Sequence, residues 1–199
     1  VLFTVAVVAP VALWRSPDAF SRLRGSDLLA ASGAGVALAL HFAAWFASLD
    51  HTSIPASVTL VQTQPVFVAV GAWALLDERV TPRRAVGIVV AVVGVGAMSL
   101  GDVLLGAVPV LGELAVGGDV AGTTLYGNAL ALVGAVAAAA YVLAGRSLRQ
   151  RVPLFPYVTV VYAVCAVALF AVAAAGGHSL VGYPAREWVL FAAMALGPG

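Results

Sequence analysis

The sequence predicts an all-α integral membrane protein, a polytopic bundle of helices that cross a lipid bilayer. Hydrophobic residues make up 62% of its 199 residues, and charged residues make up only 10%. The mean hydropathy of +1.05 lies far above that of a soluble domain. Residues 54–76 and residues 85–100 contain no charged residue, and each stretch is long enough to cross roughly 30 Å of hydrocarbon as a helix.

Five complete spans and two partial spans are predicted along the chain. The first partial span ends near Leu13 and the last begins at Trp188, while the complete spans cover residues 27–49, 54–76, 83–101, 126–145 and 154–175. Thr81 and Pro82 suit the N-cap and the first position of the span that follows the charged turn. Because both ends of the sequence lie inside apolar runs, we expect the chain to be part of a longer protein.

The positions of the arginines predict the orientation of these spans. All ten basic residues are arginine, and nine of them lie in three connections, residues 14–26, 79–84 and 146–151. These connections fall on one face of the membrane if every predicted span crosses it, and only Arg186 falls on the other face. Cytoplasmic connections carry an excess of arginine and lysine. We therefore expect a multi-pass protein of the plasma membrane with its arginine-rich connections in the cytoplasm.

The sequence carries no sign of an enzyme or a metalloprotein. A formal net charge of +1 gives no reason to expect a nucleic acid partner. Cys165 is the single cysteine, so no intramolecular disulfide is expected. Neither H-E-x-x-H nor G-x-S-x-G occurs, and no histidines and acidic residues cluster at metal-ligand spacing. We predict no catalytic residue, no metal ion and no cofactor.

Polar side chains inside the predicted spans are the candidates for a binding site, because such groups are costly at depth unless they face a partner or a water-filled cavity. His41 and Gln62 are expected about 4–5 Å outside the midplane and level with each other. Trp45 lies one turn from His41 on the same helix face. Pro65 has no N–H to donate to Val61, so we expect it to kink its helix and leave that carbonyl without a partner.

Gln64 and Tyr141 complete the predicted substrate-binding set. Gln62 and Gln64 lie about 200° apart on a continuous helix, so only one of them is expected to face a cavity. Two alternatives stay open at this point. His41 can be a structural residue that pairs with a glutamine or a carbonyl between helices, and Trp45 can be an interfacial anchor.

The charged turn between residues 76 and 85 forms a second candidate cluster. Acidic residues at the C-terminus of a helix are unfavourable unless cations lie close to them, and arginines follow directly in the sequence. We predict either a cytoplasmic ion-pair cluster that holds the helical hairpin together or a gate. Its members are Glu78, Arg79, Arg83 and Arg84.

Two parts of the sequence resemble the EamA-type repeat of the drug/metabolite transporter superfamily. The first is Ser53-Ile-Pro-Ala-Ser-Val-Thr-Leu with the run from Pro65 to Arg79, followed by Gly87 and Gly94. The second, Gly127 to Arg146, is similar to the opening helix of that family's second repeat.

Members of that family have ten helices arranged as two inverted five-helix repeats, and the resemblance implies the same division here. Residues 1–101 would form a partial first repeat, from the end of helix 2 to helix 5. Residues 102–125 would form an external linker, and residues 126–199 a partial second repeat, from helix 6 to the start of helix 8.

The resemblance also implies a function. We predict a membrane transporter that moves a small organic metabolite or drug-like solute by alternating access, in the direction of export. Proton coupling through His41 and facilitated diffusion are both open, since histidine changes its charge near neutral pH. The expected partners are the small-molecule solute and the lipid bilayer, with a homodimer left open. The alternatives are a membrane-embedded enzyme and a membrane scaffold subunit that transports nothing.

Overall fold

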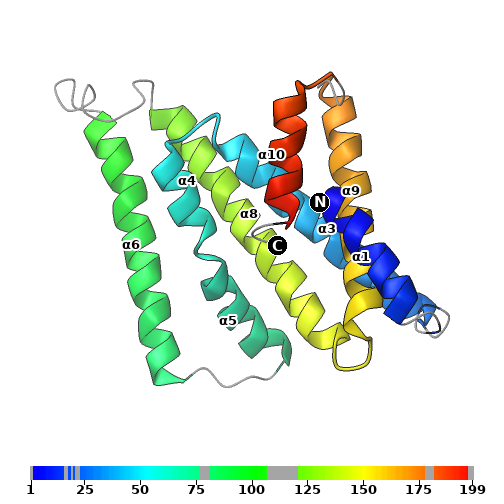
Figure 1. Cartoon of the computed structure of the whole chain (residues 1–199). Coiled ribbons are helices and arrows are strands. Elements are labelled where there is room, and N and C mark those ends of the chain that lie inside the picture. The colour runs from blue at the N-terminus through cyan, green and yellow to red at the C-terminus, as the bar shows by residue number, and fades with distance from the viewer. Residues whose placement is uncertain are drawn as a thin grey trace. The chain divides into compact units, whose positions relative to one another are not determined.

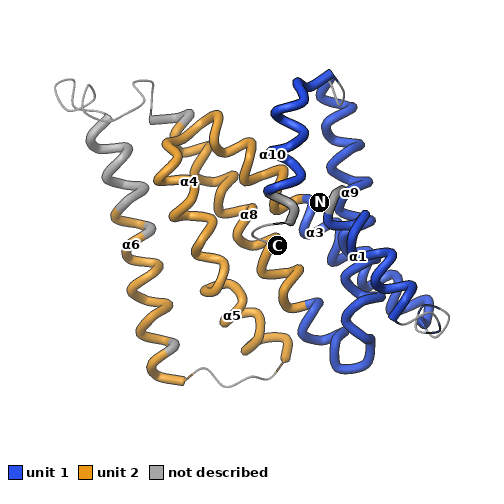
Figure 2. Tube along the Cα trace, in the orientation of Figure 1, with its two compact units in different colours: residues 1–39, 144–199 blue, residues 40–143 orange. Residues whose placement is uncertain are grey.

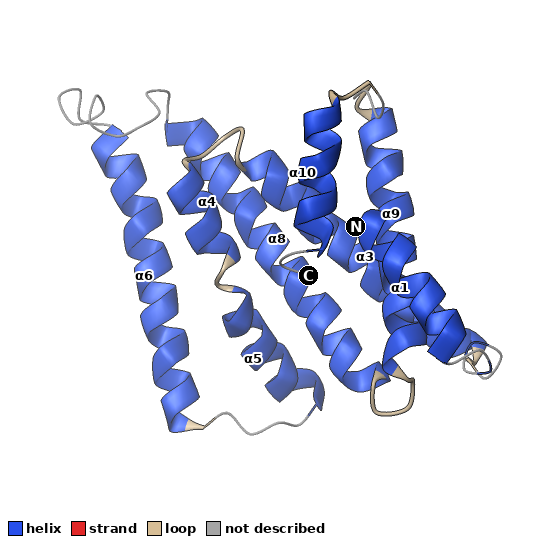
Figure 3. Ribbon diagram, in the orientation of Figure 1, coloured by secondary structure: helices blue, strands red, loops and turns tan. Residues whose placement is uncertain are grey.

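The computed structural model describes residues 2–15, 18, 20, 23–76, 81–106, 121–177 and 182–196. Within these ranges the regular secondary structure is helical, without a strand (Figure 3). The helices, labelled in Figure 1, are α1 Leu2–Arg15, α3 Gly25–Ser48, α4 Ile54–Val61, α5 Gln64–Leu76, α6 Pro82–Gly106, α8 Ala121–Leu148, α9 Leu154–Ala175 and α10 Ala185–Leu196.

Four segments in the described part of the chain are long and apolar enough to cross a membrane: Gly25–Ser48, Ile54–Leu76, Thr124–Leu148 and Leu154–Ala175. Each coincides with a complete span predicted from the sequence, so the prediction of a helical membrane protein is confirmed. The fifth predicted span, residues 83–101, lies within α6. The described apolar stretch of α6, Ala85–Gly94, is shorter than a full span, so the total of five stays a prediction.

The chain forms two compact units, residues 1–39 with 144–199 and residues 40–143 (Figure 2). We call them unit 1 and unit 2. The units group helices by contact, whereas the predicted repeats, residues 1–101 and 126–199, follow chain order. The two divisions therefore differ without excluding each other, and the repeats stay a prediction. Residues 107–120 of the predicted external linker lie outside the described residues.

In unit 1, α1 packs against α9 and α10. The first half of α3 approaches α9 very closely at Gly35, where an added Cβ would lie 2.7 Å from the Val161 carbonyl oxygen and 2.8 Å from Cβ of Val164. At the start of α3, the buried Asp27 accepts a hydrogen bond from Nε of Arg151 at 2.8 Å. This ion pair ties the beginning of α3 to the connection between α8 and α9.

In unit 2, α6 packs against both α4 and α5, which follow one another along it (Figure 1). The turn between α3 and α4 lies on the beginning of α8. The Thr52 hydroxyl donates to Oδ1 of Asn128 at 2.8 Å, and an added Cβ on Gly127 would lie 2.7–2.9 Å from atoms of His51 and Thr52.

Two of these contacts join residues that the predicted spans place at the same end of the bundle, while the side that faces the cytoplasm stays a prediction. Asp27, the first residue of the predicted span 27–49, forms an ion pair with Arg151 of the connection 146–151. Thr52, in the connection between α3 and α4, shares a hydrogen bond with Asn128, near the start of the predicted span 126–145. The second contact places the beginning of α8 beside the turn after α3, as expected if α6 crosses the membrane, and that crossing stays a prediction.

A labelling experiment tests this orientation. In the full-length protein, a cysteine in place of the exposed Gln150 is expected to be protected from an impermeant thiol reagent in intact cells. A cysteine in place of the exposed His51 is expected to react. Permeabilised cells provide the control, since both positions should then react. Labelling of position 150 from outside intact cells would contradict the predicted number of spans.

Candidate functional site

His41 lies on α3 and connects it to α8. Its ring nitrogen Nδ1 lies 2.9 Å from the carbonyl oxygen of Gly134. A carbonyl oxygen only accepts, so Nδ1 carries the hydrogen of this bond and Nε2 is the nitrogen left for another partner. This is the interhelical pairing with a carbonyl that the sequence left open as the structural role of His41. The bond occupies one ring nitrogen and does not exclude a role in binding for the other.

Gly134 is the residue that brings three helices together at this level. A Cβ added there would lie 3.3 Å from the His41 carbonyl oxygen and 3.5 Å from both the Trp45 backbone nitrogen and Cγ2 of Val61. The absence of a side chain therefore allows the backbones of α3 and α8 to approach closely, with the end of α4 beside them. His41 and the end of α4 consequently lie next to the same residue of α8.

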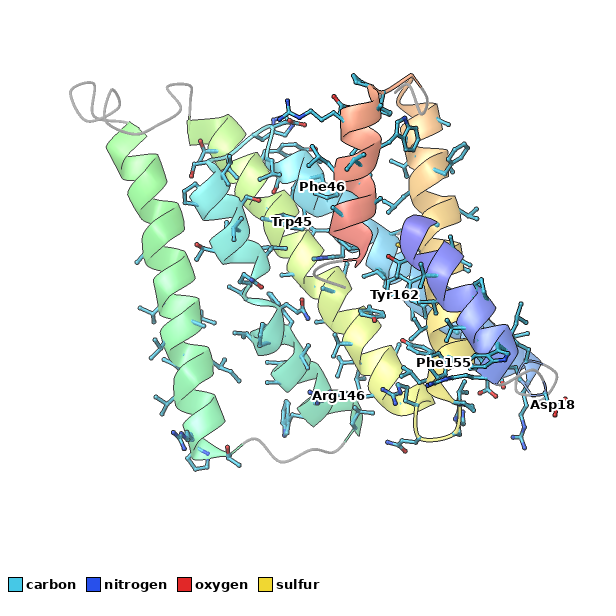
Figure 4. The ribbon with its side chains drawn as sticks, viewed as in Figure 1. Asp18, Trp45, Phe46, Arg146, Phe155 and Tyr162 are labelled. Carbon is cyan, nitrogen blue, oxygen red and sulfur yellow. The ribbon has the colours of Figure 1, made fainter. Side chains whose placement is uncertain are left out.

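An aromatic cluster continues from His41 along α3. The rings of His41 and Trp45 are stacked with centroids 5.9 Å apart, which confirms that the two side chains share a helix face. Trp45 and Phe46 stack at 5.2 Å, and Figure 4 labels both of them. The indole nitrogen Nε1 of Trp45 is buried and has no hydrogen-bond partner among the described residues. It is therefore a donor that the described residues leave unpaired.

The predicted helix over residues 54–76 is two helices, and this is the main correction to the sequence analysis. α4 ends at Val61 and α5 begins at Gln64. The hydroxyl of Thr63 donates to the Leu60 carbonyl at 2.6 Å, and the Thr63 N–H reaches the same oxygen at 3.1 Å. Thr63 thus ends α4, and the expected kink at Pro65 is a complete break in the helix.

The break leaves backbone acceptors inside a membrane span. Pro65 has no N–H for the carbonyl of Val61, and Val66 donates to Thr63 at 2.8 Å rather than to Gln62. In the described part of the chain, no backbone N–H donates to the carbonyls of Val61 or Gln62. Such groups are tolerated at membrane depth only where protein or water can reach them.

The two glutamines lie on either side of this break. Gln62 is exposed and follows the last residue of α4, whereas Gln64 is half-buried and begins α5. The sequence analysis placed them about 200° apart on one continuous helix. That prediction was wrong, because the helix is broken between them. Both side chains therefore stay candidates for the site, and Pro65 occupies the second position of α5, where its missing N–H costs little.

The remaining predicted site residues are less closely tied to His41. Tyr141 is half-buried, two helical turns beyond Gly134 on α8. In the charged turn, Glu78 and Arg79 lie outside the described residues, as does the side chain of Arg84. Arg83 is described and exposed at the start of α6. The proposed ion-pair cluster or gate stays a prediction.

Sequence analysis missed a pair of buried serines that holds α3 to α4. Ser48 and Ser57 are both fully buried, and their hydroxyl oxygens lie 2.6 Å apart. The Ser48 hydroxyl donates to the Trp45 carbonyl at 2.6 Å. The signal was weak, since serine is common in membrane helices, but their position at facing helix ends could have indicated a contact. No group of three His, Cys, Asp or Glu residues able to hold a metal ion occurs among the described residues.

Comparisons with known proteins concern the family and the fold of the chain. A family model described as the EamA-like transporter family matches residues 1–100. Among solved structures, a chain described only as "Crystal structure of protein" is similar over 98% of this chain, with a TM-score of 0.65 and 23% sequence identity. This similarity shows the fold. The match covers 62% of that chain, so the present chain spans less than two thirds of its length. No curated protein matches the sequence.

Proposed function

Because the chain belongs to the EamA-like transporter family of membrane transporters, we propose that it moves a small organic solute across the membrane by alternating access, in the direction of export. The observation that carries this proposal is the break between α4 and α5 next to Gly134 and His41. The family supports a transporter and gives no support to the alternatives of an embedded enzyme or a scaffold subunit.

A broken helix gives a membrane protein a binding site that a continuous helix cannot provide. Helix ends inside a span present unpaired carbonyl and N–H groups, and solutes and ions bind at such ends in many secondary transporters. Here the carbonyls of Val61 and Gln62 are acceptors, and the indole N–H of Trp45 is a donor. His41 adds Nε2 as either a donor or an acceptor, according to its protonation.

The aromatic cluster supports an organic solute over a simple ion. His41, Trp45 and Phe46 form a stack of rings along one helix, and flat aromatic surfaces bind apolar parts of organic molecules.

The remaining proposals follow from the family and from the positions of the arginines. The complete protein would have ten helices in two inverted repeats and lie in the plasma membrane, with the arginine-rich connections of the present chain in the cytoplasm.

Rejoining the broken helix tests the proposed function. In the full-length protein, the double variant Thr63→Ala with Pro65→Ala removes the hydroxyl bond to Leu60 and supplies the missing N–H. We expect α4 and α5 to join into one helix and transport of the solute to fall by an order of magnitude or more, because the unpaired acceptors disappear. Transport is measured as counterflow in proteoliposomes, and insertion by monodispersity of the purified variant.

The same span supplies a matched control. Thr59 donates its hydroxyl to the Pro55 carbonyl at 2.7 Å, and Pro55 lies in the first turn of α4, where it interrupts nothing. The variant Thr59→Ala with Pro55→Ala makes the same chemical change outside the break and is expected to transport like the wild type. Wild-type transport by a well-inserted Thr63→Ala, Pro65→Ala protein would contradict the proposal.

A further inference from the structure

We propose that the surface where α1 ends and α9 begins binds the headgroup of an anionic phospholipid. We call it the headgroup surface, and its residues are Leu13, Trp14, Arg15, Leu154 and Phe155. It lies entirely within unit 1, at the end that the arginine pattern assigns to the cytoplasm. Its role is separate from the solute site in unit 2.

The cation at the centre of this surface lies over an aromatic ring. α1 packs against α9, and the guanidinium carbon of Arg15 lies 5.8 Å from the centroid of the Phe155 ring. Figure 4 labels Phe155 at the start of α9. A guanidinium over a ring face is attracted by the ring quadrupole while its N–H groups remain able to donate. Those N–H groups form a planar fork that matches the oxygens of a phosphate.

In the described part of the chain, the residues around Arg15 are exposed, as the residues of a lipid contact would be. Trp14 is 80% exposed, Leu13 is 59% exposed and Leu154 is 41% exposed. Tryptophan is enriched where the hydrocarbon meets the headgroups. Exposed leucines beside a cation at a helix end would contact acyl chains while the cation contacts the phosphate. A free phosphate ion has no acyl chains that could contact these apolar side chains.

The charge balance at the same end of unit 1 selects an anionic lipid over a zwitterionic one. Asp27 is already paired with Arg151 at 2.8 Å. Counting the described residues at this end, five arginines oppose two acids, an excess of 5 − 2 = 3 positive charges. The arginines are Arg15, Arg24, Arg146, Arg149 and Arg151, and the acids are Asp18 and Asp27. Negative surface charge attracts such clusters, by about 1 kcal/mol for each arginine near the surface.

The test measures lipid binding by the purified full-length protein in detergent, using native mass spectrometry. Phosphatidylglycerol and phosphatidylcholine with identical acyl chains are titrated separately. We expect tighter binding of phosphatidylglycerol, and we expect Arg15→Gln to weaken it about fivefold, which corresponds to the loss of one arginine at the surface. Arg15→Lys, which keeps the charge and loses the fork, is expected to have an intermediate affinity.

Arg186 provides the matched control. It is exposed at the start of α10, at the end that the arginine pattern assigns to the outer face, and Arg186→Gln changes the net charge of the protein by the same amount. We expect this variant to bind phosphatidylglycerol like the wild type. Thermal unfolding of each variant, followed in parallel, separates a loss of lipid affinity from a loss of folded protein. If Arg15→Gln does not fold, Arg15→Lys still tests the proposal.

Three results would overturn the proposal. The first is equal affinity for phosphatidylglycerol and phosphatidylcholine, and the second is an equal effect of Arg15→Gln and Arg186→Gln. The third is displacement of the lipid by soluble glycerol phosphate at a similar concentration, which would assign the surface to a free anion. None of these results bears on solute transport, which depends on the site in unit 2.

Discussion

Gly35→Ala is expected to destabilise the protein by about 1–3 kcal/mol, the usual cost of placing an extra group in a close-packed interior. The added methyl would lie 2.7 Å from the Val161 carbonyl oxygen and 2.8 Å from Cβ of Val164. Neither atom is the end of a flexible side chain, so α3 and α9 would have to move apart. The measurement is thermal unfolding of the purified full-length protein in detergent.

Gly33 is the control for this prediction, since it lies two residues away in the same helix. An added Cβ at Gly33 meets nothing within 4 Å, so Gly33→Ala should be neutral or should stabilise the helix by up to about 1 kcal/mol. The two identical substitutions are therefore expected to differ, with a loss of stability at position 35 and no loss at position 33. Equal unfolding temperatures for the two variants would show that the close approach of α3 and α9 does not limit stability.

His41→Ala is expected to reduce transport of the solute about 5- to 100-fold. It removes a partly buried hydrogen bond to the Gly134 carbonyl and half of a ring stack with Trp45. Loss of a polar partner usually costs about 1–3 kcal/mol of free energy, and a similar loss in solute binding corresponds to this range. The substitution also removes Nε2, the ring nitrogen left for a solute. Uptake into proteoliposomes at a series of pH values gives the measurement.

His41→Gln separates a structural role from a role in proton coupling. The glutamine amide can still donate to the Gly134 carbonyl, but it cannot change its charge near neutral pH. If His41 carries the coupled proton, this variant should retain binding of the solute and lose the pH dependence of transport. A variant that keeps the wild-type pH profile would make His41 a structural residue only.

The sequence predicted the broad arrangement well, because it depends on local pattern. The limits of the span over residues 54–76 agree with the outer ends of α4 and α5. His41 and Trp45 share a helix face, as their spacing of four residues predicts. The break itself was harder to predict, since Pro65 indicated its position while Thr63 determines its form by bonding back to Leu60.

Contacts between distant parts of the chain could not be predicted in the same way. Gly33 and Gly35 are equivalent by composition, and only the approach of α9 makes one of them intolerant of a methyl group. Asp27 and Arg151 stand 124 residues apart, so their pairing depends on the packing of the helices between them. The role of Gly134 likewise follows from its neighbours on α3 and α4, which no local pattern around it reveals.

The serine pair between α3 and α4 bears on how protons could move through unit 2. Ser48 has a single hydroxyl hydrogen and gives it to the Trp45 carbonyl, so Ser57 must be the donor in the contact between the two hydroxyls. This chain of hydrogen bonds therefore runs in one direction and ends on an oxygen that has no hydrogen to pass on. In this arrangement the serine pair offers no continuous path for a proton, whereas an imidazole such as that of His41 can both accept and donate one.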